Sequence, residues 1–330
     1  MSTIPNELQQ KKATLLIIGG GRLGTAVLQG LLSNPDTAGL LSRIVVAVRS
    51  EGTQNRLQRL LRSSLSSRCV DDSQVRTSVI LSDSTPAAIE HADIIFLACG
   101  HNDCEQSLAR QSIKDAFRRR LGKQTIVSFM GGVTIDTLRH ILFTEKGQPP
   151  LQTETACCIL RALPNVAAKF NQSITAVARV SESSAAERSK DIHESRTETI
   201  LRLFGTVIWT AEQDINAAGA LCASSLAYYA TIIEAVAEGG RGQNSAISRE
   251  TALQLSAQAA KGAARLIEAG ETPEQIRAAI VSPGGSTARG IQAMKDRQIA
   301  PLLREAIFET SGAADDLSTN AVRSSSETSH

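Results

Sequence analysis

An apolar run that ends abruptly in glycine constrains the fold of this chain more than any other stretch. Residues 15–18 read Leu-Leu-Ile-Ile, and Gly19, Gly21 and Gly24 then follow with the spacing G-x-G-x-x-G. A helical pattern with one apolar face begins directly after the glycines. A buried strand, a glycine turn and a helix start are the arrangement that holds the pyrophosphate of a dinucleotide. The motif therefore predicts a Rossmann-type nucleotide site near the start of the chain.

Each glycine of this motif has its own physical reason. Gly19 allows the tight turn, Gly21 has no side chain to block the phosphates, and Gly24 lets the helix pack close to the strand. The backbone N–H groups of the helix start, which includes Arg22 and Leu23, then face the anion together with the positive end of the helix dipole. We interpret these five residues as cofactor-binding, and the alternative is a glycine-rich turn without a ligand.

Composition limits the classes of function that the chain can serve. With 330 residues, of which 42% are hydrophobic and 21% charged, it is typical of a soluble protein with two domains. A formal net charge of +2 and 3% aromatic residues argue against a nucleic-acid surface. No apolar run approaches the roughly 20 residues that span a membrane, and the polar residues 1–12 lack the apolar core of a signal peptide.

The six cysteines do not form the paired C-x-x-C motifs of a zinc site. His101 and Cys104 are three residues apart, but no second pair of ligands accompanies them. We therefore expect no metal site, and we expect a reduced, cytoplasmic protein.

Strand-like and helical patterns alternate over residues 13–211, which favours a parallel sheet covered on both faces. The expected strands are residues 15–18, 44–48, 79–81, 94–98, 125–129, 157–162 and 174–180, with one more after Gly205. The expected helices are 24–32, 53–64, 104–117 and 135–142, and residues 181–195 indicate a solvated loop or an exposed helix. We interpret residues 1–12 as a flexible arm and 13–211 as an α/β Rossmann-like NAD(P)-binding domain.

Residues 212–310 have little strand signal and are rich in residues that favour helix. The expected helices are 214–238, 248–269, 273–280 with Thr272 as its cap, 287–294, and a final one to 309. Such long alanine-rich helices are too apolar for one isolated layer, so we expect an all-α domain for dimerisation and substrate binding, packed against another copy of the chain. Residues 311–330 are rich in Ser, Thr and Asp, and predict a disordered tail.

The end of the second expected strand bears on the choice of nucleotide. NAD-binding folds commonly place a carboxylate there to hold the ribose 2′-OH. Here the strand runs into Arg49 and Ser50, a positive fork and a hydroxyl that suit a 2′-phosphate. We therefore expect NADPH, with NADH possible because Arg49 can be an ordinary loop arginine and Glu51 lies close by.

A second glycine-rich turn, residues 282–287 (Ser-Pro-Gly-Gly-Ser-Thr), ends where a helical pattern begins. Unblocked backbone N–H groups at a helix N-terminus bind anions, and Ser286 and Thr287 add hydroxyl donors. A substrate carboxylate would suit this turn. The alternative is a plain connection between two helices, capped by a hydroxyl side chain.

In the order of its motifs from residue 15 to 309, the chain resembles the pyrroline-5-carboxylate reductase family. Beyond the glycine motif, residues 92–98 resemble the family's fourth strand, and residues 126–128 with 132–135 resemble its fifth strand and turn. Residues 161–165, Arg-Ala-Leu-Pro-Asn, are similar to the family's Arg-x-Met-Pro-Asn. In the helical half, Glu234-Ala235 and the turn at 282–287 match, and that turn is the family's most specific signature.

The resemblance implies an oxidoreductase of proline biosynthesis that reduces the cyclic imine of pyrroline-5-carboxylate with NAD(P)H. The substrate-binding residues would be Ser282, Gly284, Gly285, Ser286, Thr287 and Ser224. The Thr287 hydroxyl would hydrogen-bond the ring nitrogen as the catalytic group, and Ala98 and Asn165 would lie near the nicotinamide. Two helical domains would interlock in a homodimer, so that each site uses residues of both chains. No acid–base pair is needed if the imine arrives protonated.

The chain departs from the family pattern around the expected substrate pocket. Residues 222–228 read Cys-Ala-Ser-Ser-Leu-Ala-Tyr where the family usually has Ser-Gly-Ser-Gly-Pro-Ala-Tyr. Gly219 replaces a threonine, Gly100-His101 replaces Lys-Pro, and Ala167 replaces a proline. Two alternatives therefore stay open: a reductase of a modified or six-membered cyclic imino acid in a specialised pathway, and a weakly active NADP-binding regulatory relative.

Overall fold

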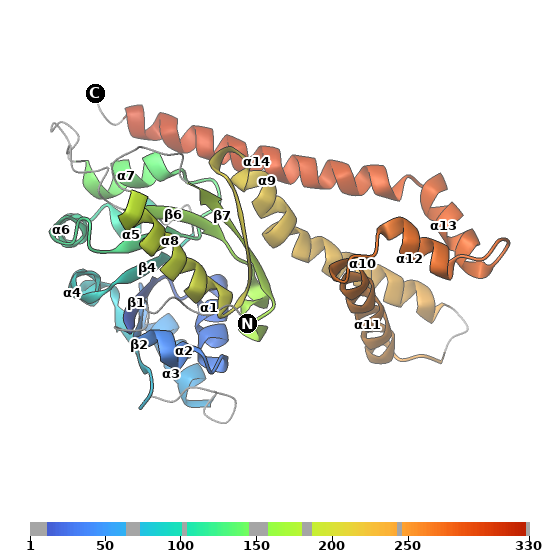
Figure 1. Ribbon diagram of the computed structural model, residues 1–330, viewed down its shortest axis with the longest axis horizontal. Helices are drawn as coiled ribbons and strands as arrows, with labels where there is room; N and C mark the ends of the chain where they lie inside the picture. The colour runs from blue at the N-terminus through green and yellow to red at the C-terminus, as the bar shows by residue number, and fades with distance from the viewer. Residues whose placement is uncertain are drawn as a thin grey trace. The chain divides into compact units, whose positions relative to one another are not determined.

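A computed structural model of the chain (Figure 1) describes residues 12–63, 73–100, 104–144, 158–179, 187–242 and 246–327. An eight-stranded sheet in the order β3-β2-β1-β4-β5-β6-β7-β8 organises the first part of the chain. Strands β1 to β6 are parallel, β7 is antiparallel to β6, and β8 is parallel to β7. The strands are β1 (Ala13–Ile18), β2 (Leu41–Val48), β3 (Arg76–Leu81), β4 (Ile94–Leu97), β5 (Thr125–Ser128), β6 (Cys158–Leu163), β7 (Ser173–Arg179) and β8 (Gly205–Ala211). The order 3-2-1-4-5-6 of the first six is that of the doubly wound dinucleotide-binding fold.

Strand β1 is buried on both faces, which explains why its sequence is a continuous apolar run. Leu15 and Ile17 pack into one apolar cluster with residues of α1 (Arg22–Ser33) and α8 (Glu187–Arg202). Leu16 and Ile18 pack into a second cluster with residues of α6 (Gln111–Arg119) and α7 (Ile135–Phe143). Alternate side chains of one strand thus anchor helices on opposite faces of the sheet.

The other helices of this part are α2 (Thr37–Leu40), α3 (Glu51–Ser63), α4 (Thr85–His91), α5 (Cys104–Leu108) and the 3₁₀ helix η6 (Val166–Phe170). The α/β class and the strands expected from the sequence are confirmed. The helix expected at 104–117 is instead two helices, because Arg110 adopts an extended backbone between α5 and α6. Helix α4 was not expected, since its seven residues are too few for a periodic signal. The expected arm lies outside the described residues apart from Lys12.

The chain divides into two compact units, here called the sheet unit (residues 1–223 and 311–330) and the helical unit (residues 224–310). The division falls later than the expected boundary at 211, because α9 (Ile215–Gly219) and all but the last residue of the π-helical turn Ala220–Ser224 belong to the sheet unit. The helices that follow are α10 (Ser225–Arg241), α11 (Arg249–Glu268), α12 (Pro273–Ile280), α13 (Ser286–Asp296) and α14 (Ile299–Glu327). The expected cap of α12 is confirmed, since Thr272 and Gln275 form a reciprocal capping box.

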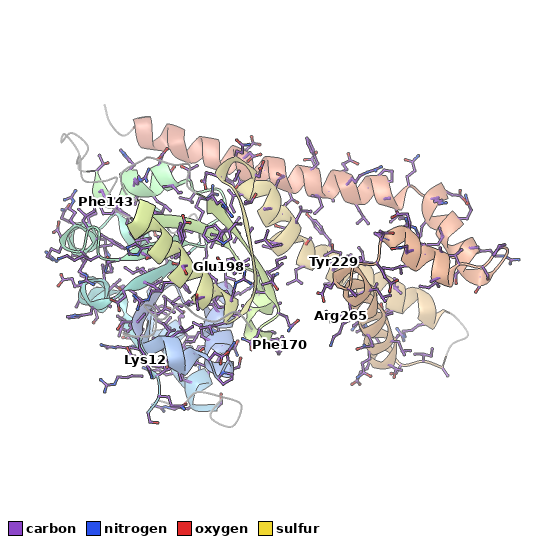
Figure 2. All side chains as sticks on the ribbon, viewed as in Figure 1. Lys12, Phe143, Phe170, Glu198, Tyr229 and Arg265 are labelled. Carbon is purple, nitrogen blue, oxygen red and sulfur yellow. The ribbon has the colours of Figure 1, made fainter. Side chains whose placement is uncertain are left out.

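The helical unit buries few of its described side chains. Among the described residues 224–242 and 246–310, Ser225, Ala237 and Ala252 are buried, whereas large apolar side chains such as Tyr229 and Val236 are 60% and 59% exposed. Figure 2 shows Tyr229 and Arg265 on the helices of this unit. Further exposed apolar residues of the unit are Ile232, Ile247, Leu255, Leu266, Ile267, Ile280, Met294, Leu302, Leu303 and Phe308.

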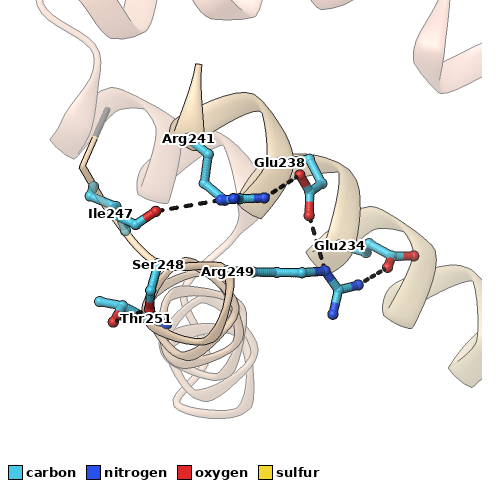
Figure 3. Close-up of polar contacts among 7 residues, drawn as sticks. All are labelled: Glu234, Glu238, Arg241, Ile247, Ser248, Arg249 and Thr251. Atoms are coloured by element: carbon cyan, nitrogen blue, oxygen red, sulfur yellow. Dashed lines mark hydrogen bonds and ion pairs between the residues drawn. The ribbon is translucent and has the colours of Figure 1, made fainter. Parts of the chain in front are cut away.

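A surface ion network joins α10 to the start of α11 (Figure 3). Arg249 pairs with Glu234 and, at 3.2 Å, with Glu238, which also accepts from Arg241 at 3.0 Å. Ser248 caps α11 by accepting from the N–H of Thr251 at 3.1 Å. Exposed ion pairs add only about 0–1 kcal/mol each, so this network orients the two helices rather than supplying a core.

The expectation of a disordered tail at 311–330 is wrong for the described part, because α14 continues as helix to Glu327. Contacts with the rest of the sheet unit hold the start of the 311–330 segment: Asp315 accepts a hydrogen bond from the Asn216 side chain at 2.8 Å. The Leu317 side chain lies against Gly132, where an added Cβ would be 2.8 Å away. Asn216 in turn accepts from Arg161, a buried arginine that also pairs with Glu212 at 2.9 Å. Composition alone could not reveal these partners.

One long helical stretch, Glu212–Arg241, is apolar enough to cross a membrane by length and composition. The expectation that no apolar run approaches the length of a membrane span is therefore wrong for this stretch. Only 22% of its most apolar window is buried within the chain. The stretch thus carries an apolar surface that this single chain leaves uncovered.

Candidate cofactor pocket and anion-binding turn

The glycine loop between β1 and α1 is fixed by close packing. Gly19 has a positive φ of 117°, and a Cβ there would lie 2.6 Å from the carbonyl group of Ala98. A Cβ on Gly24 would lie 2.1 Å from the carbonyl oxygen of Gly19, so α1 can approach the loop only with glycine at this position. At Gly21 an added Cβ would meet nothing within 4 Å. The loop therefore leaves open space at the one glycine expected to lie against a phosphate.

A pocket of about 390 Å³ lies at the carboxyl ends of β1, β2 and β4. Five of the expected cofactor residues line it, namely Gly19, Gly21, Arg49, Ser50 and Ala98. Such a crevice, where the strand order reverses at β1 and β4, is where doubly wound sheets bind ligands. The structure thus brings together residues that are separated by up to 79 positions in the sequence.

The other expected cofactor residues do not line this pocket. Arg22 and Leu23 are the first residues of α1, and Leu23 packs against the apolar core. Gly24 lies in contact with the backbone of Gly19, a residue of the loop itself. Asn165 is only 6% exposed, and its amide is used within the protein. It donates to the Cys222 carbonyl at 2.7 Å and accepts from the Ala167 N–H at 2.9 Å, which caps η6. Asn165 therefore supports the π-helical turn rather than the pocket.

Two arginines that sequence reasoning missed also line the pocket. Arg56 reaches from α3 to the Gly20 carbonyl, and Arg110 holds the Ser82 carbonyl at 3.0 Å from the start of α6. With Arg49, three arginines line the pocket, and no aspartate or glutamate is among the described lining residues. In the sequence Arg56 and Arg110 look like ordinary surface arginines. The strand order of the sheet brings them to the same pocket as Arg49. The pocket wall is therefore suited to a ligand with several negative charges.

Ser50 has a structural role as well. Its hydroxyl oxygen accepts from the N–H of Thr53 at 3.3 Å, so it caps the N-terminus of α3. Arg49 and Ser50 thus present their side chains at a helix start, where an anion is favoured.

The second expected anion site, in the helical unit, has the geometry of an open helix start. Gly284 has a positive φ of 72°, and the N–H of Gly285 donates to the Ser282 carbonyl at 3.0 Å, which closes a tight turn. Gly285 occupies the cap position of α13, and no side-chain hydrogen bond caps this end of the helix. Ser286 and Thr287 follow as its first two residues, with Thr287 exposed. Thr287 is thus inside the helix and is not its cap.

Ser224, also expected in the substrate site, is the last residue of the π-helical turn. Such turns insert one extra residue into a helix and frequently occur at functional sites. Within the described residues, no group of His, Cys, Asp and Glu side chains could hold a metal ion, and His101 lies outside them.

Comparison with known proteins gives a consistent result. Residues 212–317 match the family model described as pyrroline-5-carboxylate reductase dimerisation. A pyrroline-5-carboxylate reductase of Penicillium fellutanum is 30% identical over 92% of this chain and 91% of its own length. Pyrroline-5-carboxylate reductase ucsG of Acremonium sp is 29% identical over 90% of this chain and 91% of its own length. The solved Plasmodium falciparum pyrroline carboxylate reductase with NADP bound has the same fold, with a TM-score of 0.69 at 18% identity, over 94% of this chain and 99% of that one.

Proposed function

Because this chain belongs to the pyrroline-5-carboxylate reductase family, we propose that it reduces the C=N bond of pyrroline-5-carboxylate to give proline, with a nicotinamide cofactor. The observation that carries the proposal is the pocket at the ends of β1, β2 and β4, with its glycine loop and three arginines. Its open wall at Gly21 fits a pyrophosphate, since no Cβ intrudes there. The chain is thus an oxidoreductase that acts on a carbon–nitrogen bond.

For the cofactor, we expect NADPH rather than NADH. A carboxylate that would hold a ribose 2′-OH is missing from the described lining, and Arg49 and Ser50 lie at the helix start after β2. Arg49 and Ser50 would hold the 2′-phosphate by charge-assisted hydrogen bonds. The N–H groups at the start of α1 would hold the pyrophosphate, and Ala98 would lie beside the nicotinamide half.

For the substrate, the turn at 282–287 supplies the carboxylate site. Its backbone N–H groups at Gly285, Ser286 and Thr287 would bind the carboxylate, and the Thr287 hydroxyl would donate to the ring nitrogen. The bound cofactor supplies a hydride for the imine carbon. The protein's share is to orient the ring and to hold its nitrogen, so that no buried acid–base pair is required.

The helical unit is a dimerisation domain by family and by its exposed apolar surface. We infer that the long apolar stretch Glu212–Arg241 packs against a second copy of the chain and does not enter a membrane.

The test has two parts. NADPH oxidation is followed with pyrroline-5-carboxylate and, because Cys222, Ala223 and Leu226 depart from the family pattern, with six-membered and substituted cyclic imines. Turnover with none of these imines, despite tight NADPH binding, would favour the regulatory alternative.

The second part measures dissociation constants for NADPH and NADH on wild type and Arg49→Ala. Loss of a charge-assisted phosphate contact should weaken NADPH by roughly 1.5–3 kcal/mol and spare NADH. Unchanged affinities for both cofactors would remove Arg49 from the 2′-phosphate site.

A further inference from the structure

The loop between β1 and α1 contains three consecutive glycines, and one arginine reaches across to its centre. Arg56 lies on α3, and its guanidinium donates to the carbonyl oxygen of Gly20 and, at 3.4 Å, to the hydroxyl of Thr25. The Thr25 hydroxyl donates to the same Gly20 oxygen at 3.2 Å. Two helices thus hold one carbonyl group of the glycine loop.

Gly20 has little room to move toward the sheet. A Cβ on Gly20 would lie 2.6 Å from Val48 and 2.8 Å from Leu57, so this glycine is packed against β2 and α3. The N–H of Gly19 is already bonded to the Ala47 carbonyl at 2.9 Å. The remaining freedom of the loop is rotation of the peptide between Gly20 and Gly21, which two adjacent glycines allow at little steric cost.

The direction of that peptide decides how the loop meets an anion. In a planar trans peptide the C=O and N–H bonds point in opposite directions. Holding the Gly20 oxygen toward α3 therefore turns the N–H of Gly21 away from α3 and Thr25. A rotated peptide would instead present a carbonyl oxygen where the N–H now lies, and a carbonyl repels phosphate.

We propose that Arg56 is a positioning residue that braces the triple-glycine loop, so that the Gly21 N–H is kept in the orientation that binds the cofactor pyrophosphate. The proposal rests on the proposed function, because it assumes a dinucleotide in this pocket. It separates the roles of two arginines on one pocket wall: Arg49 acts on the 2′-phosphate of NADPH alone, and Arg56 acts on the part that NADPH and NADH share.

The test compares Arg56→Met, which keeps an apolar stem, with Arg59→Met. Arg59 is an exposed arginine on the same helix whose Nε bonds the Asn55 carbonyl, so its removal costs the same charge and leaves the loop untouched. Calorimetric titration of the full chain gives dissociation constants for NADPH and NADH. We expect Arg56→Met to weaken both cofactors by about tenfold with their ratio kept, and Arg59→Met to change either by less than about twofold.

A second readout needs no cofactor. Amide hydrogen exchange of the ligand-free protein should become faster over residues 19–25 in Arg56→Met, and Thr25→Val should give a smaller change in the same direction. Loss of NADPH affinity alone would assign Arg56 to the 2′-phosphate and overturn the brace. Wild-type affinity for both cofactors in Arg56→Met would overturn it as well, whereas a wild-type protein that binds neither cofactor would defeat the proposed function itself.

Discussion

The two units of this protein meet the need for a core in different ways. In the sheet unit, the side chains of β1 are buried in two apolar clusters, one on each face of the sheet. In the part of the helical unit that the structure describes, three side chains are buried and large apolar ones are exposed, up to 78% for Phe308. Since a helix needs an apolar face packed against something to be stable, this exposure is what a dimerisation domain shows in a single chain. The sheet unit thus has apolar clusters of its own, whereas the described part of the helical unit leaves most of its large apolar side chains exposed.

The largest effect should come from a charge on the exposed apolar surface of the helical unit. Val236→Glu would place a charge without a partner in the interface between two copies, at a cost of roughly 3–5 kcal/mol. Sedimentation velocity should show monomers, and turnover should fall, while NADPH still binds the sheet unit. Val236→Ile is the matched control and should remain a dimer. A stable dimer in Val236→Glu would exclude this part of α10 from the interface.

The sheet unit should instead be most sensitive where its own packing is tight. Gly24→Ala puts a methyl group 2.1 Å from the Gly19 oxygen, so we expect a loss of roughly 1–3 kcal/mol in the free energy of unfolding. Gly21→Ala meets nothing within 4 Å and should keep its stability while it binds NADPH more weakly. Chemical denaturation and cofactor titration of both variants check this contrast. Equal losses of stability in the two variants would contradict the open wall at Gly21.

Thr287 tests whether the helical unit contributes chemistry as well as an interface. Thr287→Ala removes the hydroxyl and keeps the backbone turn, so turnover should fall by about 10- to 150-fold, equivalent to a lost hydrogen bond to a charged group. Thr287→Ser keeps a hydroxyl and should retain much more activity. Because Thr287 follows the cap position, Gly285, the Ala variant should melt close to wild type. Unaltered turnover with a lower melting temperature would make the hydroxyl structural.

The sequence allowed the sheet unit to be predicted well because its signals are local. The apolar run at β1 and the glycines after it act within a few residues, and so does the capping box at Thr272 in the helical unit. The helical extension of α14 was missed because its support is tertiary: Asp315 bonds Asn216, which lies 99 residues earlier. Likewise, Arg56 meets the glycine loop only because β2 pairs with β1.

In the candidate site, too, residues with a local sequence signal could be predicted, and residues that depend on tertiary contacts could not. Gly19, Gly21, Arg49 and Ser50 line one pocket, as expected for residues that follow β1 and β2, because the ends of parallel strands share one edge of the sheet. The place of Asn165 near the nicotinamide stays a prediction, because a motif shows which residue is present and not which groups it bonds. In the structure its amide bonds Cys222 and Ala167.

The smallest expected effect is a difference in acid sensitivity between the units. Burial, and then the charge of Arg196, lower the pKa of His193 in the sheet unit below its ordinary 6.5, and its Nδ1 lies 2.6 Å from the Thr125 hydroxyl. Residues 224–310 contain no histidine. Well above pH 6.5 His193 is neutral in both folded and unfolded chains and has no effect. As the pH falls below 6.5, the unfolded chain takes up the proton first, so the sheet unit loses stability until the lowered folded pKa is reached.

Denaturation of His193→Gln between pH 5 and 7 measures this effect, since glutamine can still bond Thr125 and does not titrate. The variant should show a flatter dependence of unfolding free energy on pH than wild type, with the two curves parallel above pH 7. Dimer dissociation, which reports the helical unit, should have the same pH dependence in both proteins. The contrary result is that His193→Gln flattens the pH dependence of dimer dissociation and leaves that of unfolding unchanged. In that case the histidine acts on the dimer interface. The stability of the sheet unit and the association of the helical unit would then depend on the same residue, against what the burial of the two units indicates.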